Sequence, residues 1–443
     1  MLTKFCSCAS HAYTHSNWLV LAIVSIGGTP VPTRAQTLTS LTLLEAKAAA
    51  RRTSPELRAA REGVIAARGR ERQAGVRQNP TFAFGREQSS GGGQSNSQNI
   101  AWLELPFEPS GLRSARRDAA AARREAAEAR VTVAESQLDF EVTRAYAVAL
   151  AADRRAALSE QATAAFTEAL RVSERRYAAG DLSGYANRRL KLESARYATL
   201  RSEASLAQRS ARTELASLVA PDANAIGPLG LTLADSLTLQ ISMSGSDSLL
   251  SVALRSRGEL RVAILEAEAA AADARLAVRE RTPVPLLSAG LKTERLSISS
   301  AASQGLKGFA AGFAIPLPLW DRRVGAIEAA DADSRQRAAE IELQRRRIAR
   351  EVAEAFDAYR AADAQIALLA PQLGVESRAA LRAAQVAYAE GEITLAEWLD
   401  AVRAYREAEA SFVALQAELM IRHAALNRAI GAPSPATLTG SDR

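Results

Sequence analysis

An internal duplication constrains the fold of this chain more than any other feature of its sequence. Residues 177–183 (Tyr-Ala-Ala-Gly-Asp-Leu-Ser) are followed, 211 positions later, by a second copy at 388–394 (Tyr-Ala-Glu-Gly-Glu-Ile-Thr). The offset is 203 upstream and grows to 210 before these segments, which indicates one lengthened loop in the second copy. A period this long exceeds that of solenoid repeats, so each copy is predicted to be a whole structural unit. The upstream landmarks recur in the same order, with Glu56 matched by Glu259, Pro80 by Pro283 and Pro106 by Pro316.

Composition favours extended helices over compact globular domains. The chain is rich in Ala, Arg, Glu and Leu, whereas aromatic residues make up only 5% of its 443 positions. The abundant residues are strong helix formers, and so few aromatic side chains leave little material for large cores. We therefore expect a mainly α fold with a small β part, built from long and closely packed helices.

Both copies have the same predicted order of elements. A first helix ends before a proline, and two extended segments follow with a polar loop between them. A helical stretch of 69 residues comes next, which in the second copy is expected to kink or break near Pro371 and Gly374. A glycine then turns the chain into a return helix, so that each copy is a long antiparallel hairpin with a strand pair at its other end. The first helix, polar loop and long stretch occupy 54–78, 88–97 and 111–179 in the first copy, and 258–281, 297–305 and 322–390 in the second.

The second extended segment of each copy alternates large apolar residues with small or polar ones. This period of two predicts strands with one apolar face. Strands of about ten residues with such a face are typical of a membrane β-barrel wall, and a soluble hairpin packed on a helix is the alternative. Trp102 and Trp320 are candidates for the membrane interface, and packing on a helix end is the alternative. The apolar positions are Ala101, Leu103, Leu105 and Phe107 in the first copy and Phe309, Ala311, Phe313, Ile315 and Leu317 in the second.

The N-terminal residues are predicted to form a signal peptide. The apolar segment 18–26 is too short for a permanent membrane helix, and small residues place cleavage after Ala35. Both cysteines precede this segment, so the mature chain is expected to have no disulfide and no lipid-attached cysteine. The predicted boundaries are a signal peptide at 1–35, a first repeat at 36–219, a connector at 220–247, a second repeat at 248–432 and a disordered tail at 433–443.

Charge and motif content argue against nucleic-acid binding and catalysis. The formal net charge of +7 arises from arginines interspersed with glutamates, unlike the clustered charge of a nucleic-acid-binding patch. The sequence contains no phosphate-binding loop motif, no His-Glu-x-x-His and no Cys-x-x-Cys. His423 is the only histidine after the predicted signal peptide, and it is expected to be a packing or surface residue. We therefore expect no enzyme activity, no cofactor and no metal site.

A single copy of the chain leaves the predicted sheet incomplete. Four strands in an open sheet have two edges whose backbone amides would lack partners in lipid. Closed symmetry removes these edges, and three chains would supply a twelve-stranded β-barrel continued by a twelve-helix α-barrel. A homotrimer in contact with membrane lipid is therefore the predicted assembly.

In order, spacing and duplication, these motifs resemble the TolC outer-membrane efflux family. The resemblance covers about residues 40–432 and includes 54–60 (Ser-Pro-Glu-Leu-Arg-Ala-Ala), the strand pairs and the long hairpins. Residues 313–322 (Phe-Ala-Ile-Pro-Leu-Pro-Leu-Trp-Asp-Arg) and 388–394 are similar to its cation-efflux, CzcC-like branch. The resemblance implies a trimeric channel in the outer membrane that extends into the periplasm. It also implies docking on a periplasmic adaptor protein and an inner-membrane efflux pump.

The two turns between the long helices are the first candidate site. By the resemblance they contact the adaptor, and the alternative is that they only reverse the chain. Leu182 and Ile393, which are expected to be exposed, favour a docking role because a turn does not need them. The candidate adaptor-docking residues are Gly180, Asp181, Leu182, Ser183, Gly391, Glu392, Ile393 and Thr394.

Glu397 and Asp400 are the second candidate site. They are three residues apart and share a helix face, and their placement resembles the acidic rings at the periplasmic entrance of the family. The first copy has Ala186 and Arg189 at the matching positions, so only one hairpin of each chain would carry these acids. The alternative is that Glu397 completes a capping box with Thr394 and that Asp400 is simply solvated.

The predicted function is the outer-membrane channel-tunnel of a tripartite efflux system. Such a protein is a passive exit duct for substrates that a pump and an adaptor deliver. The alternative is a non-channel periplasmic coiled-coil adaptor or scaffold protein, which would show one hairpin flanked by β-rich segments rather than two hairpins rooted in strands. Metal cations are suggested as substrates only by the branch resemblance, and drugs or secreted proteins are the other options.

Overall fold

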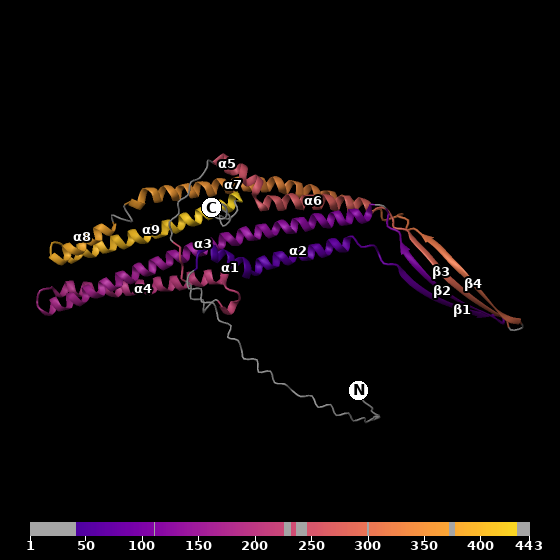
Figure 1. Ribbon diagram of the computed structural model, residues 1–443, viewed down its shortest axis with the longest axis horizontal. Helices are drawn as coiled ribbons and strands as arrows, with labels where there is room; N and C mark the ends of the chain where they lie inside the picture. Colours follow the sequence, from indigo (N-terminus) through magenta and orange to yellow (C-terminus); the bar gives the residue numbers. More distant parts are fainter. Residues whose placement is uncertain are drawn as a thin grey trace, which may run out of the picture. The chain divides into compact units, whose positions relative to one another are not determined.

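The computed structural model describes residues 41–109, 111–225, 232–235, 246–298, 301–371 and 377–431. The predicted signal peptide and C-terminal tail therefore lie outside the described residues. The same order of elements occurs twice (Figure 1). The first copy contains α1 (Leu43–Thr53), α2 (Pro55–Ala74), β1 (Thr81–Gly91), β2 (Gln94–Pro106), α3 (Leu112–Ala178), α4 (Gly184–Val219) and the short η1 (Ala223–Ala225). The second contains α5 (Ser246–Ser256), α6 (Gly258–Arg279), β3 (Leu286–Ile298), β4 (Ala301–Ala314), α7 (Val324–Ala370), α8 (Ser377–Glu390) and α9 (Leu395–Ile430).

Each copy begins with a short helix that the sequence analysis did not predict. α1 and α5 both have 11 residues, and they start 203 positions apart (246 minus 43), the same offset as the upstream landmarks. Ser54 separates α1 from α2: its hydroxyl accepts a hydrogen bond of 3.1 Å from the Leu57 amide, and Pro55 is the first residue of α2. A residue before proline disfavours helical backbone, so Ser54 ends one helix and caps the next.

A buried arginine occupies the matching position in the second copy. The Arg257 side chain is only 3% exposed, and its guanidinium lies 3.0 Å from Glu259 and 2.5 Å from Glu351 of α7. It also donates a hydrogen bond of 3.2 Å to the Ala429 carbonyl near the end of α9. Burial disfavours the charged form of Arg257, but the two carboxylates outweigh this effect and raise its pKa. This cluster joins α5, α6, α7 and α9 at one point.

The polar loops expected between the strands are largely part of the strands. The expectation for 88–97 is wrong, because β1 pairs along its whole length with Gln94–Glu104 of β2 and leaves only Gly92 and Gly93 between the two strands. These glycines have φ values of 61° and 77°, which suit a two-residue hairpin turn. The expectation for 297–305 is wrong for the same reason, since β3 and β4 occupy most of that range. Ladder hydrogen bonds use only the backbone, so polar residues can continue a strand.

β4 is shorter at its other end than the apolar alternation indicates. It ends at Ala314, so Ile315 and Leu317, which the alternation places on the strand face, lie beyond it. Pro316 has no amide hydrogen for a further ladder hydrogen bond, which accounts for the earlier end.

The four strands form one antiparallel sheet in the order β1-β2-β3-β4. β2 pairs with β3 along its whole length, so the sheet joins the two copies. In the part of the chain that the structure describes, β1 and β4 each have a neighbouring strand on one side only. The sheet is therefore open at both edges, as predicted for a single copy.

The long helix α3 packs against helices of both copies. With 67 residues and about 1.5 Å per residue, it is about 100 Å long. It packs against α2 and α4 of its own copy and against α6 and α9 of the other (Figure 1). α7 packs against α6 and α9, and α8 packs against α9. α7 ends at Ala370 and α8 starts at Ser377, which confirms the predicted break near Pro371. No helix within the described ranges has the length and apolarity needed to cross a membrane.

Part of the predicted connector folds back onto the first residues that the structure describes. Leu233 forms a parallel bridge with Leu41, and the Asp235 carboxylate accepts a hydrogen bond of 2.7 Å from the Leu43 amide. The Tyr146 hydroxyl of α3 donates to the Leu41 carbonyl at 2.7 Å. The connector thus closes the first copy against α3 rather than only linking the two copies.

Candidate functional site

Both turns between the long helices are closed by a glycine in the left-handed region. Gly180 has a φ of 87° and Gly391 a φ of 82°, which confirms the predicted turn conformation. The Asp181 amide donates to the Arg176 carbonyl at 2.9 Å, and the Glu392 amide makes the equivalent bond at 2.8 Å. These bonds satisfy carbonyl groups that the helix ends leave open. The two tips therefore have the same backbone design.

The return helices begin with different caps. Ser183 accepts a hydrogen bond of 3.2 Å from the Ala186 amide. In the second copy, the Glu397 amide donates to the Thr394 hydroxyl at 3.3 Å, and the Glu397 carboxylate accepts from the Thr394 amide at 2.7 Å. Hydrogen bonds from the backbone and side chain of Thr394 lower the pKa of Glu397. The predicted capping box is confirmed, and it turns the Glu397 carboxylate toward the start of α9.

Asp400 belongs to a charged network that spans both copies. It is exposed, and its carboxylate lies 3.5 Å from Arg403 on the same helix. Arg403 also lies 3.5 Å from Glu193 of α4. Sequence reasoning did not single out Glu193, because only the packing of the two hairpins brings it near α9. Asp400 therefore shares Arg403 with a carboxylate of the other copy, at the contact between the hairpins.

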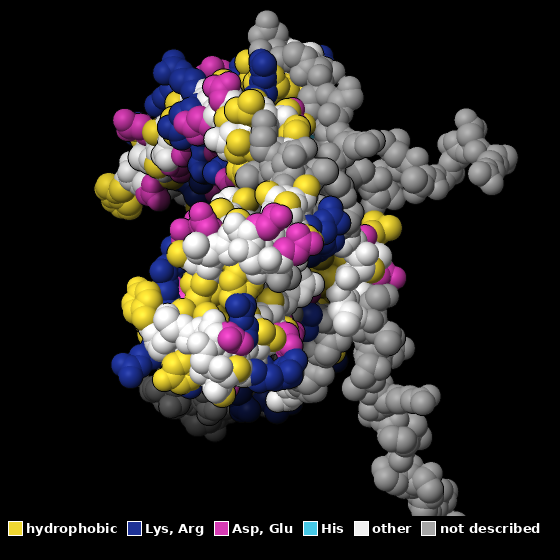
Figure 2. Space-filling model, turned by 90° about the vertical axis from the view of Figure 1, so that its left-hand side faces the viewer, with side chains coloured by type: hydrophobic (Ala, Val, Ile, Leu, Met, Phe, Trp, Pro, Cys, Tyr) yellow, Lys and Arg dark blue, Asp and Glu magenta, His cyan; other side chains and the backbone are white. Residues whose placement is uncertain are grey.

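Aromatic side chains from both copies form one cluster beneath the tips. Phe166 of α3 stacks on Tyr197 of α4 with ring centroids 4.0 Å apart, and Trp398 of α9 lies 5.4 Å from Phe166. Ile393 packs against this cluster. Leu182 and Ile393 are half-buried, which corrects the expectation that both are exposed. Figure 2 views this end of the molecule, where Lys, Arg, Asp and Glu side chains surround hydrophobic ones.

One face of the sheet is apolar in the half nearest the helices. Directly paired residues share a face, so the register of the four strands brings their apolar side chains together. Phe309 of β4 is 85% exposed and Leu291 of β3 is 70% exposed. The exposed apolar face predicted for β2 and β4 is confirmed, and β1 and β3 extend it. We call this surface the apolar band; it comprises Phe82, Phe84, Ala101, Leu103, Leu105, Leu287, Ala289, Leu291, Phe309, Ala311 and Phe313.

The opposite face of the sheet carries mostly small and polar side chains. Trp102 lies on this face. Its ring covers Gly85, where an added Cβ would lie 3.7 Å from it. Its indole N–H donates a hydrogen bond of 3.0 Å to the Glu104 carboxylate. Trp102 therefore lies on the face opposite the apolar band, and its place at the membrane interface or against a helix end stays a prediction. Trp320 is 93% exposed just beyond β4 and stays a candidate for the membrane interface.

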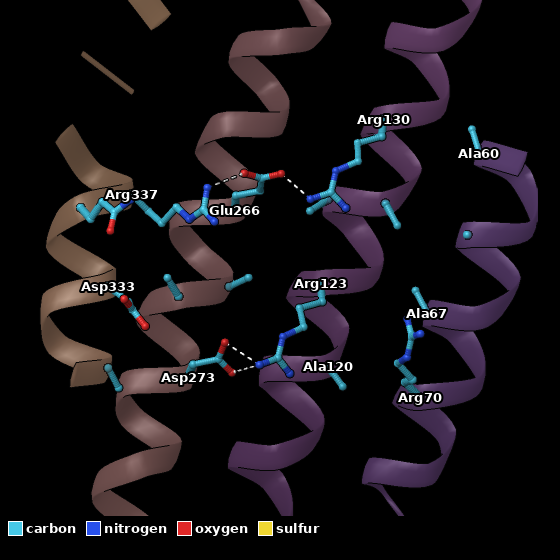
Figure 3. Close-up of a pocket in the computed structure, with 17 residues that line it drawn as sticks. Ala60, Ala67, Arg70, Ala120, Arg123, Arg130, Glu266, Asp273, Asp333 and Arg337 are labelled. Carbon is cyan, nitrogen blue, oxygen red and sulfur yellow. Dashed lines mark hydrogen bonds and ion pairs between the residues drawn. The ribbon is translucent and has the colours of Figure 1, made fainter. Parts of the chain in front are cut away.

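A groove crosses α2, α3, α6 and α7 (Figure 3). Its volume is about 700 Å³, and many of its lining residues are alanines. Charged side chains within it form pairs between helices: Arg123 lies 2.6 Å from Asp273, and Glu266 contacts both Arg130 and Arg337. Burial raises the pKa of Asp273, and Arg123 opposes that rise. The sequence does not indicate this groove, because its walls come from both copies.

The described residues show no arrangement suited to a metal centre. Among them, no group of three or more His, Cys, Asp or Glu side chains could hold a metal ion. The His423 ring lies 6.0 Å from the Tyr359 ring and forms a hydrogen bond of 3.1 Å with Asn427. Burial lowers the pKa of His423, and the nearby Lys47 lowers it further. The expected packing role of His423 is confirmed.

Comparisons with known proteins agree with this architecture. Residues 249–432 match the family model described as outer membrane efflux protein. A membrane protein from Pseudomonas aeruginosa has a TM-score of 0.72 at 22% identity, with 88% of this chain and 93% of that chain covered. The outer membrane protein VceC from Vibrio cholerae has a TM-score of 0.65 at 21% identity, with coverages of 88% and 96%. The CmeC outer membrane channel of Campylobacter jejuni has a TM-score of 0.72 at 14% identity, with coverages of 88% and 85%. A search of curated proteins found no match.

The family model and the solved structures contribute different information. At these identities, the solved structures establish a shared fold. The family match covers the second copy, and the first copy repeats the same order of elements. Residues 249–432 are therefore similar to the outer membrane efflux protein family, and the chain as a whole shares the fold of the solved outer-membrane channels.

Proposed function

We propose that this protein is the outer-membrane channel of a tripartite efflux system. It acts as a passive exit duct rather than an enzyme, and its helices extend into the periplasm. The apolar band is the observation that carries the proposal, because an exposed apolar surface of this extent needs lipid or a partner to cover it. The α3 helix, about 100 Å long and adjoining that sheet, suits a duct that continues below the membrane.

The open sheet supports a trimer. In lipid, unpaired amides and carbonyls at the edges of β1 and β4 would each be costly. Three copies that pair β4 with β1 of the next copy would close a twelve-stranded barrel. Closure would place every apolar band outward and every small, polar face toward the lumen.

The helical part has an unpartnered face that suits the same assembly. On α4, Tyr185, Leu192 and Leu206 are exposed although they are apolar. They are seven or fourteen residues apart and so lie along one face, as the seam positions of a coiled coil do. Packing of a neighbouring copy against this face would cover it and continue the layer of helices into a closed α-barrel.

The tips are proposed to dock a periplasmic adaptor protein, which in turn contacts an inner-membrane pump. Both turns have left-handed glycines and capped return helices, so their shapes are well defined. The shared aromatic cluster holds the two tips together as one surface. Metal cations are proposed as substrates because of the resemblance to the cation-efflux branch. Transport assays should therefore compare metal cations with drugs and secreted proteins.

We expect the mature protein to be recovered from outer-membrane fractions as a trimer that forms channels. Light scattering in detergent should give a protein mass of about three mature chains, and planar bilayers should show discrete conductance steps. This result follows from the need to close the sheet in lipid. A monodisperse, soluble monomer of the mature chain would overturn the proposal and favour an adaptor or scaffold.

The carboxylates at Glu397 and Asp400 can be tested without disturbing the cap. Glutamine also serves as the third residue of a capping box, so Glu397→Gln with Asp400→Asn removes charge while α9 keeps its start. If these acids line the entrance, the double variant should show weaker block by multivalent cations and lower cation preference. The difference should be larger at low salt, where screening is weak.

Glu418→Gln is the matched control for the acidic pair. Glu418 lies on the same helix, is partly exposed, and pairs with Arg422 at 2.6 Å. Its replacement should leave cation block unchanged. Block and selectivity of the double variant equal to those of the wild type would reject the entrance assignment and leave Glu397 as a cap residue only.

A further inference from the structure

Beyond the apolar band, the sheet continues into a polar half whose charges differ between its two faces. Residues paired directly across the four strands form a row. On the face of the apolar band, the row after that of Phe84 and Phe309 contains Arg86 and Lys307. The row after that contains Arg295. We call these three residues the basic belt. Each lies on the same face as the apolar band, because each is an even number of residues along its strand from a band residue.

Among the described residues, no carboxylate is paired with the basic belt. Its three side chains are exposed, and the paired positions of the polar half on this face include no Asp or Glu. The acids Glu87 and Glu294 both lie on the opposite face. There, Lys292 lies 3.3 Å from Glu294. The sheet therefore neutralises a cation on one face and leaves the cations on the other face available to a ligand.

The spacing of the belt suits phosphate groups. Lys307 pairs with Thr293, two residues from Arg295, so Lys307 and Arg295 are diagonal neighbours about 7–8 Å apart. Two long cationic side chains at this spacing can contact one phosphate from both sides, and charge-assisted bonds to phosphate are strong. Arg86 lies three strands away from Lys307, about 14 Å along the row, and would contact a second group.

Protection of the sheet edges does not account for the belt. Charged residues on edge strands do discourage pairing with other chains, and Arg86 and Lys307 lie on β1 and β4. Arg295, however, lies on β3, which has a paired strand on each side. A row of cations that includes an inner strand and adjoins an apolar surface is better explained by a ligand that covers both.

We propose that the basic belt binds the phosphate groups of lipid headgroups at the outer surface of the membrane. This inference rests on the proposed function, since it requires the apolar band to lie in the hydrocarbon layer. The first row of the belt is then only about 7 Å beyond the last row of the band, which is the depth of the headgroups. Anionic headgroups attract Lys and Arg at this depth. The band holds the acyl chains and the belt holds the phosphates of the same lipid layer.

The test measures lipid binding by the detergent-solubilised, full-length mature protein. Diphosphoryl lipid A is titrated and bound lipid is counted by native mass spectrometry, with Arg295→Gln/Lys307→Gln compared with the wild type. Each lost cation should weaken binding about fivefold, so the double variant should bind about 25-fold more weakly. Binding by the wild type should also fall as salt rises. Lys292→Gln, on the opposite face of the same sheet, is the matched control and should bind as the wild type does.

Two further arms separate the possible outcomes. Removing the phosphates from lipid A should weaken its binding to the wild-type protein. The loss should be at least as large as the loss that the double variant shows with intact lipid A. Inorganic phosphate at the same concentration should not displace the lipid; displacement would overturn the lipid assignment in favour of a free-phosphate site. Equal lipid binding by the double variant and the wild type would also overturn the inference. Conductance measurements distinguish a failure of the lipid-binding inference from a failure of the proposed function. If the wild-type protein forms channels normally, the efflux proposal stands even when the belt binds no lipid. If the wild-type protein forms no channels, the efflux proposal is rejected.

Discussion

Phe309→Arg is expected to lower the yield of trimer in the outer membrane, whereas Leu306→Arg on the same strand is expected to be tolerated. Both residues are exposed apolar side chains of β4, at 85% and 63%, but they lie on opposite faces of the sheet. An arginine on a lipid-facing barrel surface costs about 2–4 kcal/mol at the bilayer midplane and less toward the headgroups, and Phe309 lies in the band row nearest the headgroups. Each of the three copies in a trimer would bear this cost for Phe309→Arg, while Leu306→Arg would face the aqueous lumen.

The comparison of these two variants tests the orientation of the sheet directly. The measurement is the amount of heat-modifiable trimer in outer-membrane fractions, with total expression as the reference. If the sheet lay in water, both substitutions would replace an exposed apolar side chain by a soluble one. Equal recovery of trimer from the two variants would therefore contradict a lipid-facing apolar band.

Arg257→Ala is expected to lower the stability of the helical part by about 3–5 kcal/mol, the usual cost of removing one partner from a buried ion pair. The substitution leaves Glu351 with only the exposed Arg347 as a partner, and it removes the hydrogen bond from Arg257 to the Ala429 carbonyl. Burial raises the pKa of Glu351, but hydrogen bonds from Arg257 and Arg347 outweigh it and lower the pKa overall. In the wild type, this carboxylate therefore contributes stability above its unfolded-state pKa, about 4.3, and loses it as the pH falls through its folded-state pKa.

Thermal unfolding of the detergent-solubilised protein, followed by circular dichroism, measures the effect of Arg257→Ala. Arg61→Ala is the matched control, because Arg61 pairs with Glu135 at 3.3 Å on the surface. Exposed pairs of this kind contribute less than about 1 kcal/mol. The Arg257 variant should also lose part of the acid dependence that Glu351 contributes. Similar melting temperatures for the two variants would show that the buried cluster does not hold α5, α6, α7 and α9 together.

Features that depend on neighbours in the chain could be predicted from the sequence. The turn glycines were identifiable because few other residues adopt positive φ, and the capping box on α9 follows from Thr394 and Glu397 three positions apart. Proline placed the break after α7, and alternation of residue size identified the exposed face of β2 and β4. Each of these signals is local, and the duplication provided a second, independent copy of most of them.

Features that depend on contacts between distant residues required the tertiary structure. No local pattern indicates that Arg257 is buried against Glu351, that Glu193 meets Arg403, or that the walls of the groove come from both copies. The polar ends of the strands were misjudged because composition describes side chains, whereas strand pairing is made by the backbone. Likewise, the register of four strands decides that the apolar band and the basic belt share one face, and a shift of one residue would separate them. By itself, then, the sequence determined the repeated unit, its helices and its turns, because these follow from backbone preferences and periodicity. Packing and register decided the charged clusters and the surfaces, because both depend on which distant segments meet.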